Sequence, residues 1–185
     1  HGHACEDQPV PSASPILRPD PLQAAREVLQ STFGHTDFRG LQAGVIGEIL
    51  AGGNALAVLP TGGGKSVCYQ IPALVRSGLG LVVSPLIALM TDQVAALQQS
   101  GVAAEKLDSM TSPDLRASIW QRIGEGTLNL LYISPEGLMQ PAMLERLSHV
   151  PLALFAIDEA HCVSQWGHDF RPEYRMVGRL AEVIP

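Results

Sequence analysis

The 185-residue sequence is poor in cysteine, lysine and aromatic residues, and it contains no long apolar run. Its three cysteines, Cys5, Cys68 and Cys162, have no paired spacing, which argues against a disulfide framework or a cysteine-based metal motif. We expect reduced thiols, with Cys68 and Cys162 as small core residues. No stretch approaches the roughly 20 apolar residues of a membrane-spanning helix. With no signal-peptide pattern at the N-terminus, we expect a cytoplasmic protein without a membrane partner.

Lysine occurs only at Lys65 and Lys106, so ten of the twelve basic residues are arginines. The formal net charge of −6 argues against indiscriminate binding to nucleic acid, although it leaves room for a local basic groove. Apolar residues make up 46% of the chain and charged residues 16%, which is typical of a globular α/β protein. The scarcity of lysine draws attention to Lys65, which follows three glycines.

Residues 1–20 are rich in proline and show little hydrophobic periodicity, which predicts a disordered segment ahead of one folded domain, residues 21–185. In that domain, apolar runs of strand length alternate with helical patterns. This alternation predicts an α/β fold with a mostly parallel sheet and helices on both faces. The expected strands are 55–59, 79–84, 103–107, 129–133 and 152–157; the expected helices are 21–32, 41–50, 67–75, 85–99, 112–123, 135–147 and 172–183. In the helix 85–99, the residues expected to face the core are Leu86, Leu89, Met90, Val94 and Leu97.

The segment Leu59-Pro60-Thr61-Gly62-Gly63-Gly64-Lys65-Ser66 lies between an expected buried strand and an expected helix. Glycines let successive backbone N–H groups turn towards an anion, and the start of the following helix adds partial positive charge. This order predicts a phosphate-binding loop in which Lys65 reaches the β- and γ-phosphates and Ser66 offers its hydroxyl to Mg²⁺. Leu59 stands where the general pattern has Gly or Ala, and an ordinary glycine-rich turn is the alternative.

A second apolar run, residues 152–157, ends in Asp158-Glu159-Ala160-His161. A run that is apolar on both faces predicts a central parallel strand, and ligands of open α/β sheets bind at the carboxyl ends of the strands. Asp158 suits Mg²⁺ held through water, and Glu159 suits the role of base for an attacking water. Two solvated acids at a strand end are the alternative, but their place after the glycine loop favours a nucleotide-hydrolysis site.

Two further segments carry weaker signals. Arg39 and Gln42 lie three residues apart at the start of an expected helix, so both can face one direction, and a glutamine amide can match both polar edges of adenine. The segment 162–171 gathers Trp166, Phe170 and Arg171 directly after the two acids. Aromatic side chains with arginine suit stacking on single-stranded bases, and a loop anchored by buried aromatics is the open alternative.

Taken together, these segments closely resemble the first RecA-like motor domain of the RecQ-family DNA helicases of superfamily 2, from about residue 21 onwards. The matching segments, in chain order, are Phe38-Arg39 with Gln42, residues 60–74, residues 83–94 with Ser84-Pro85, residues 132–136, Asp158 to His161, and Ser164 to Tyr174. The last of these resembles the aromatic-rich loop of the family and is its most specific mark. Gly137 departs from the family pattern, which often has Arg there, and Gly40 replaces a common Pro.

The resemblance implies ATP and Mg²⁺ as cofactors, with ATP-binding residues His35, Arg39, Gln42, Thr61, Gly62, Gly63, Gly64, Lys65 and Ser66. It implies that Lys65, Asp158 and Glu159 are catalytic, and that Ser66 and Asp158 bind Mg²⁺. The implied DNA-binding and coupling residues are Ser84, Pro85, Trp166, His168, Phe170 and Arg171.

For the whole protein, the resemblance implies ATP-dependent, 3′-to-5′ unwinding of DNA, with single-stranded DNA and duplex junctions as partners in a bacterial cytosol. We expect the chain to stop before the family's next motif and before a second motor domain, with zinc bound only outside this chain. The alternatives are a nucleotide-binding module without turnover of its own and another DExH-type nucleic-acid translocase. A P-loop kinase or GTPase has less support, because the sequence contains no Asn-Lys-x-Asp segment.

Overall fold

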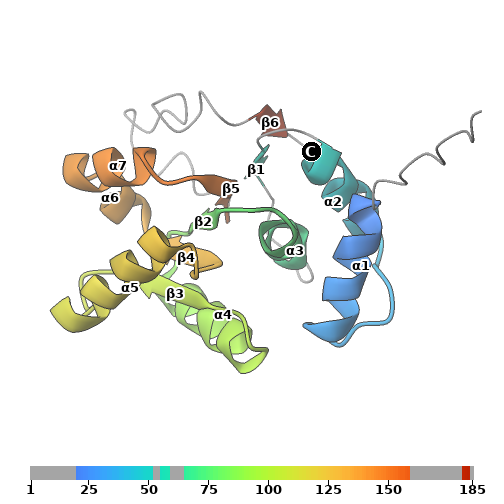
Figure 1. Ribbon diagram of the computed structural model, residues 1–185, viewed down its shortest axis with the longest axis horizontal. Coiled ribbons are helices and arrows are strands. Elements are labelled where there is room, and N and C mark those ends of the chain that lie inside the picture. Colours follow the sequence, from blue (N-terminus) through green and yellow to red (C-terminus); the bar gives the residue numbers. More distant parts are fainter. Residues whose placement is uncertain (1–19, 52–54, 59–64, 159–180, 184–185) are drawn as a thin grey trace, which may run out of the picture.

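The computed structural model describes residues 20–51, 55–58, 65–158 and 181–183. Six strands form one sheet in the order β3-β4-β2-β5-β1-β6, and neighbouring strands are parallel throughout (Figure 1). The strands are β1 Ala55–Val58, β2 Leu79–Val83, β3 Ala104–Leu107, β4 Leu130–Ile133, β5 Leu152–Ile157 and β6 Ala181–Val183. The helices are α1 Pro21–Ser31, α2 Gln42–Ala51, α3 Val67–Val75, α4 Ile87–Gln99, α5 Pro113–Glu125, α6 Pro135–Leu138 and α7 Pro141–Ser148.

Alternate residues of the central strands face opposite layers of helices, because successive side chains of a strand point to opposite faces. Val82 and Leu154 pack in one cluster with buried residues of α2, α3 and α4. Their neighbours Leu81 and Phe155 pack in a second cluster with residues of α5, α6 and α7. The predicted parallel sheet with helices on both faces is therefore confirmed, and the fold is α/β and RecA-like.

We call the face of the sheet covered by α2, α3 and α4 the first face. Helix α1 adds a further layer on this face by packing against α2 and α3 (Figure 1). Its cluster contains the fully buried Ala25 and Ile46. The predicted start of α1 is confirmed: Pro21 occupies the first turn, and Asp20 accepts a hydrogen bond from the backbone N–H of Leu22 at 3.0 Å. Within the residues that the structure describes, no helix is long and apolar enough to cross a membrane.

Three of the predicted helices differ from the structure. The helix expected over 135–147 is broken into α6 and α7, because Pro141 lacks a backbone N–H and cannot continue a helix, whereas it suits the first turn of a new one. The helix expected from Pro85 begins at Ile87, and Leu86, which was expected to face inward, is 47% exposed. The start of α4 is therefore more open to solvent than its apolar sequence suggests.

The helix expected to run to residue 183 is also contradicted at its end. Residues Ala181–Val183 form β6, which pairs in parallel with β1. The short segment Ala181-Glu182-Val183 fits a helix or a strand equally well by its pattern. The edge of β1 supplies the backbone hydrogen-bond partners that make it a strand. The rest of that expected helix lies outside the described residues.

Helix α3 lies close to the sheet because β2 carries a glycine opposite it. A Cβ atom at Gly80 would come within 2.6 Å of the Cβ of Ala73 and 2.8 Å of the Cδ2 of Leu130. Side chains this close must move, so the missing side chain of Gly80 sets the spacing between helix and sheet. This close packing fixes α3, the helix that directly follows Lys65 and Ser66, relative to the central strands.

Candidate active site

The predicted acid Asp158 lies at the carboxyl end of a central strand of the sheet. In the parallel pairing, Ile157 lies opposite Val58 on β1 and opposite Val83 on β2. The next residue, Asp158, is held there by a hydrogen bond of 2.8 Å from its backbone N–H to the carbonyl of Val83. Asp158 therefore follows the carboxyl end of a central strand, beside the strand from which the glycine-rich segment leaves.

Lys65 and Ser66 stand directly before the first turn of α3. The carbonyl of Lys65 accepts a hydrogen bond from the N–H of Cys68 at 3.0 Å, and the carbonyl of Ser66 accepts one from Gln70 at 2.9 Å. The Ser66 hydroxyl does not cap the helix. These two residues thus occupy the positions that a phosphate-binding lysine and a metal-binding serine take at a helix N-terminus.

A group of polar side chains surrounds the Asp158 carboxylate. The hydroxyl of Tyr69, on α3, lies 3.2 Å from Oδ2 of Asp158, and Nε2 of Gln93, on α4, lies 3.5 Å from the same oxygen. Tyr69 also donates to Oε1 of Gln93 at 2.8 Å. Three separate elements of the first face, α3, α4 and β5, therefore meet at one carboxylate.

Further hydrogen-bonded polar side chains lie deeper in the core between the sheet and α3. Nε2 of Gln70 donates to the hydroxyl of the fully buried Tyr132 at 2.9 Å. Burial raises the pKa of Tyr132 to about 12. Burial, followed by the nearby Tyr132 and Asp158, raises the pKa of Tyr69 well above its usual value, so both phenols stay protonated at neutral pH.

Cys68 is the buried core residue that the sequence predicts, since its exposed fraction is only 4%. Burial raises the pKa of its thiol, and the nearby Lys65 partly offsets this rise. The thiol is therefore protonated at neutral pH and suits packing rather than nucleophilic chemistry. Cys162 lies outside the described residues.

Arg39 and Gln42 form a reciprocal hydrogen-bonded pair at the start of α2. The backbone N–H of Arg39 donates to Oε1 of Gln42 at 2.8 Å, and the N–H of Gln42 donates to the carbonyl of Arg39 at 3.1 Å. This arrangement satisfies backbone groups at the helix start in the way a capping box does. His35 is exposed on the preceding turn, where its N–H donates to the carbonyl of Leu29 at 3.2 Å. The Gln42 amide thus has a capping role that the sequence interpretation did not include.

In the segment after β2, the residues exposed to solvent are not the ones that the sequence analysis expected. Ser84 is buried, and its hydroxyl accepts a hydrogen bond from the N–H of Leu86 at 3.4 Å. Pro85 is half-buried, whereas Leu86 and Ile87 are about half exposed, at 47% and 50%. The solvent-facing surface of this segment is therefore apolar.

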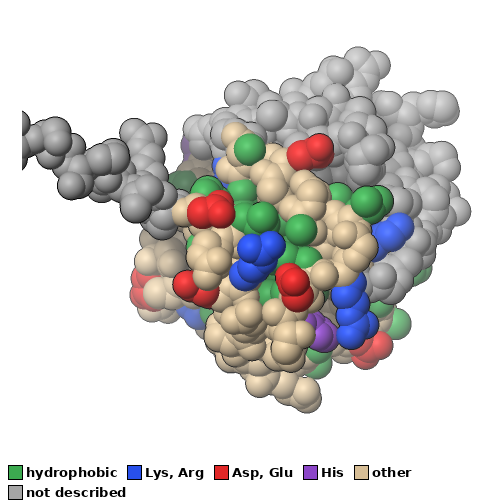
Figure 2. Space-filling model, turned by 90° about the vertical axis from the view of Figure 1, so that its right-hand side faces the viewer, with side chains coloured by type: hydrophobic (Ala, Val, Ile, Leu, Met, Phe, Trp, Pro, Cys, Tyr) green, Lys and Arg blue, Asp and Glu red, His purple; other side chains and the backbone are tan. Residues whose placement is uncertain are grey.

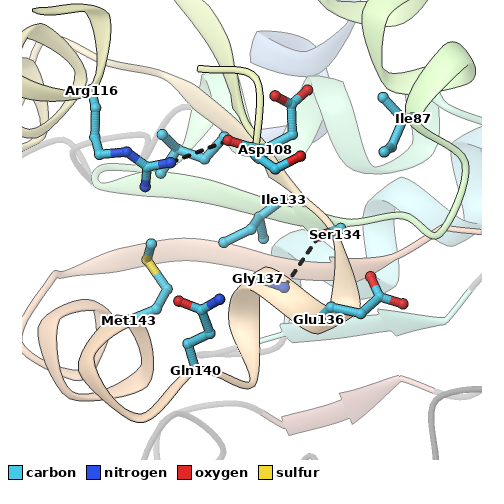
Figure 3. A pocket seen from close by; sticks show the side chains of 11 residues that line it. Ile87, Asp108, Arg116, Ile133, Ser134, Glu136, Gly137, Gln140 and Met143 are labelled. Carbon is cyan, nitrogen blue, oxygen red and sulfur yellow. Dashed lines mark hydrogen bonds between the residues drawn. The ribbon is translucent and has the colours of Figure 1, made fainter. Parts of the chain in front are cut away.

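A pocket of about 280 Å³ lies beside Ile87, at the carboxyl ends of β3 and β4. Figure 3 shows Arg116 reaching from α5 towards the backbone of Asp108, and the two groups are joined by a hydrogen bond of 3.1 Å to the Asp108 carbonyl. Gln140 and Met143 lie across the pocket from them (Figure 3). The sequence analysis did not predict that Arg116 lines a pocket. The only signal was a basic residue on α5, the helix that follows the turn after β3.

Of the predicted site residues, several lie outside the described residues: Thr61, Gly62, Gly63, Gly64, Glu159, Trp166, His168, Phe170 and Arg171. Among the described residues, no group of three or more His, Cys, Asp or Glu side chains could hold a metal ion. The face formed by α1 and α2 carries acidic and basic side chains interspersed with small apolar areas rather than a patch of one sign (Figure 2).

A parallel sheet, a glycine-rich segment before α3 and an acid after a central strand define a nucleotide-binding domain of the RecA-like class. The family model for the DEAD/DEAH box helicases matches residues 39–184. Since this match covers most of the sequence, the chain belongs to the DEAD/DEAH box helicase family.

Curated relatives refine this assignment. The chain is 47% identical over 163 residues to the ATP-dependent DNA helicase RecQ of Pasteurella multocida, which is 88% of this chain and 26% of the relative. It is 48% identical to the RecQ of Haemophilus influenzae, over 87% of this chain and 26% of that protein. Against the probable ATP-dependent DNA helicase RecS of Bacillus subtilis, it is 47% identical over 86% of this chain and 32% of that protein. The chain thus spans between a quarter and a third of these relatives, and the resemblance to the RecQ family is confirmed over that span.

Proposed function

We propose that this chain is the ATP-binding half of the motor in a RecQ-type, ATP-dependent DNA helicase that unwinds DNA in the 3′-to-5′ direction. The observation that carries the proposal is the common sheet edge, where Asp158 lies beside the strand that leads to Lys65 and Ser66. In this proposal residues 21–185 form the first motor domain, and residues 1–20 precede it. A second motor domain elsewhere in the protein completes the site.

The nucleotide contacts divide into phosphate and base contacts. The backbone of Thr61 to Gly64 and the ammonium of Lys65 hold the phosphates. Gln42, with Arg39 and His35, recognises adenine, which requires the Gln42 amide to exchange its bond to Arg39 for bonds to the base. The two partners face each other at the start of α2, and the exchange involves a rotation of the Gln42 side chain.

Asp158 and Ser66 are the residues that would hold Mg²⁺. The donor set fits the ion, since a carboxylate and a hydroxyl are oxygen ligands, and Mg²⁺ takes its remaining ligands from water and substrate phosphate. When bound, Mg²⁺ neutralises charge that develops on the phosphates during hydrolysis. Glu159 orients the attacking water and accepts its proton.

DNA contacts are proposed for the segment that starts at Ser84 and Pro85 and for the loop that contains Trp166, His168, Phe170 and Arg171. In the described segment, the exposed apolar side chains of Leu86 and Ile87 suit contact with bases or sugars better than the buried Ser84 side chain does. We propose single-stranded DNA and duplex junctions as substrates and the bacterial cytosol as the location, in keeping with relatives that are named ATP-dependent DNA helicases and come from bacteria.

The test is Lys65→Ala in the full-length protein, with Lys106→Ala as the matched control. Lys106 is the only other lysine and forms an ion pair of 2.6 Å with Asp108. We expect Lys65→Ala to lower DNA-stimulated ATP hydrolysis by at least about 100-fold, since one preorganised donor on a reacting group has this effect. Lys106→Ala should leave basal hydrolysis near the wild-type rate. Wild-type hydrolysis by Lys65→Ala would refute the phosphate-loop assignment.

Glu159→Gln separates a hydrolase from a module that only binds nucleotide. An amide cannot accept the proton of water, so this variant should bind ATP with Mg²⁺ like the wild type and hydrolyse none of it. Equal losses of affinity and of rate would place Glu159 in binding instead. Absence of ATP hydrolysis by the wild-type full-length protein, with and without single-stranded DNA, would favour the binding module.

A further inference from the structure

Most of the first face of the sheet is apolar, yet a chain of polar side chains runs through it to Asp158. Tyr69 is fully buried among apolar residues of α2, α3, α4 and the central strands. A buried phenol needs a hydrogen-bond partner, because an unpaired hydroxyl away from water costs free energy. The partners of Tyr69 come from two other elements, Gln93 on α4 and Asp158 after β5.

The distances indicate which way these hydrogen bonds run. A tyrosine hydroxyl carries one hydrogen, and its distance of 2.8 Å to Oε1 of Gln93 is shorter than its distance of 3.2 Å to Oδ2 of Asp158. When the Gln93 oxygen accepts from Tyr69, the Gln93 amide nitrogen is turned towards Asp158, where it lies 3.5 Å from Oδ2. Tyr69 thus acts on the carboxylate through Gln93, whose amide it orients.

Both contacts fall on the same carboxylate oxygen. A carboxylate rotates readily about the bond that joins it to its Cβ atom, because this terminal torsion has broad energy wells. The Gln93 amide on Oδ2, itself held by Tyr69 on α3, restricts that rotation, while the backbone N–H of Asp158 donates to the carbonyl of Val83 at 2.8 Å. The orientation of the second oxygen, Oδ1, is restricted as a consequence.

We propose that Tyr69 and Gln93 are positioning residues that hold the Asp158 carboxylate in the orientation that receives the Mg²⁺ of the bound nucleotide. This inference rests on the proposed function of Asp158. Neither residue touches the nucleotide in this scheme, and both act through the carboxylate. Groups that orient a metal ligand in this way typically change metal affinity by about 10- to 100-fold when they are removed.

The first experiment compares Tyr69→Phe with Tyr132→Phe in the full-length protein. Each change deletes one hydroxyl from a fully buried tyrosine, but Tyr132 is bonded to Gln70 and interacts with Tyr69, and makes no direct hydrogen bond to Asp158 among the described contacts. The readout is the affinity of a fluorescent ATP analogue, measured in EDTA and across a Mg²⁺ titration. We expect Tyr69→Phe to raise the Mg²⁺ concentration at half-maximal binding by about 10-fold, the low end for such groups, because Tyr69 acts on the carboxylate through Gln93.

In the same experiment, affinity in EDTA should match the wild type for both variants, and Tyr132→Phe should keep the wild-type Mg²⁺ dependence. Equal shifts in Mg²⁺ dependence for the two variants would mean that loosening of the core, rather than the orientation of Asp158, causes the effect. A wild-type Mg²⁺ dependence for Tyr69→Phe would overturn the proposal directly.

The second experiment uses Gln93→Met, which keeps the length of the side chain and removes its amide. If Tyr69 and Gln93 act on one oxygen, the double variant with Tyr69→Phe should shift Mg²⁺ dependence by less than the two single shifts combined. Simple addition of the two effects would contradict a shared action on Asp158. The Lys65→Ala result keeps the two proposals apart: if that variant loses hydrolysis while Tyr69→Phe behaves like Tyr132→Phe, only the positioning role fails.

Discussion

The two faces of the sheet differ in what their cores contain. The face covered by α2, α3 and α4 holds Tyr69, Gln70 and Tyr132 among its buried residues, and these side chains are hydrogen-bonded. The face covered by α5, α6 and α7 has a buried cluster of leucine, valine, isoleucine and phenylalanine only. Both faces use alternate residues of the same strands, so the difference is made by the side chains and not by the topology.

This difference separates stability from chemistry within one sheet. Burying polar groups costs free energy unless each finds a partner, whereas an apolar cluster gains free energy from every buried atom. The apolar face therefore suits a purely packing role, and the polar face suits a site that must hold side chains in fixed orientations. Changes on the two faces should accordingly affect different measurements.

The largest loss of stability is expected from Phe155→Ala, which truncates a residue that is 2% exposed on the apolar face. We expect the free energy of unfolding to fall by about 3–5 kcal/mol, because a large core side chain is lost and a cavity remains. The measurement is urea unfolding, together with nucleotide affinity well below the melting temperature. Weakened affinity in the folded variant would show that the apolar face also shapes the site.

A smaller effect is expected from Asp108→Asn, at the sheet edge beyond β3. The ammonium of Lys106 holds the pKa of the Asp108 carboxyl below its usual value, aided by the backbone N–H of Met110. The folded-state pKa is depressed, so its contribution to stability is present above the unfolded pKa of about 3.9 and is lost as pH falls below it. At pH 7 we expect the variant to be less stable by about 1.5–3 kcal/mol, the range for hydrogen bonds to charged groups.

The check on Asp108→Asn is urea unfolding of the variant and the wild type from pH 7 down to pH 2. The gap between their free energies of unfolding should close as Asp108 becomes protonated in the wild type. A gap that stays constant across this range would assign the loss to altered packing instead of charge.

The smallest effect is expected from Ser112→Ala at the start of α5, on the apolar face. The Ser112 hydroxyl accepts a hydrogen bond from the N–H of Leu115 at 3.2 Å and caps the helix. Loss of such a cap should lower the free energy of unfolding by about 1 kcal/mol. Thermal unfolding measures this, and the Mg²⁺ dependence of nucleotide binding should stay unchanged. A change in that Mg²⁺ dependence would contradict the claim that the apolar face affects stability alone.

Local sequence patterns were sufficient for most of the fold because burial follows periodicity. The helix at 67–75 and the strand at 152–157 are found at the predicted residues, since the helix directly follows the glycine-rich segment and the strand is a continuous apolar run. Pro141 was missed as a break because the apolar pattern of 135–147 continues through it. The strand Ala181–Val183 was missed because its partner, β1, lies more than a hundred residues earlier in the chain.

The candidate site was predictable where a motif is continuous in sequence. Lys65, Ser66 and Asp158 could be named because a glycine-rich segment and an acid after a strand are local signals. The approach of Tyr69 and Gln93 to Asp158 depends on how α3 and α4 dock, which no local pattern encodes. A glutamine on the inward side of α4, next to the buried Val94, was the one available hint.

The parallel pairing of all neighbouring strands gives the domain two unlike ends. Asp158 and the segment from Ser84 to Ile87 leave from the carboxyl end, while the turns at Ser100–Gly101 and Gly126 connect helices to the opposite end. Both glycines adopt positive φ angles, 82° and 72°, in exposed turns. An affinity tag or surface anchor inserted at either turn would hold the domain by the end remote from the nucleotide. Single-molecule experiments could then leave the catalytic end facing solution.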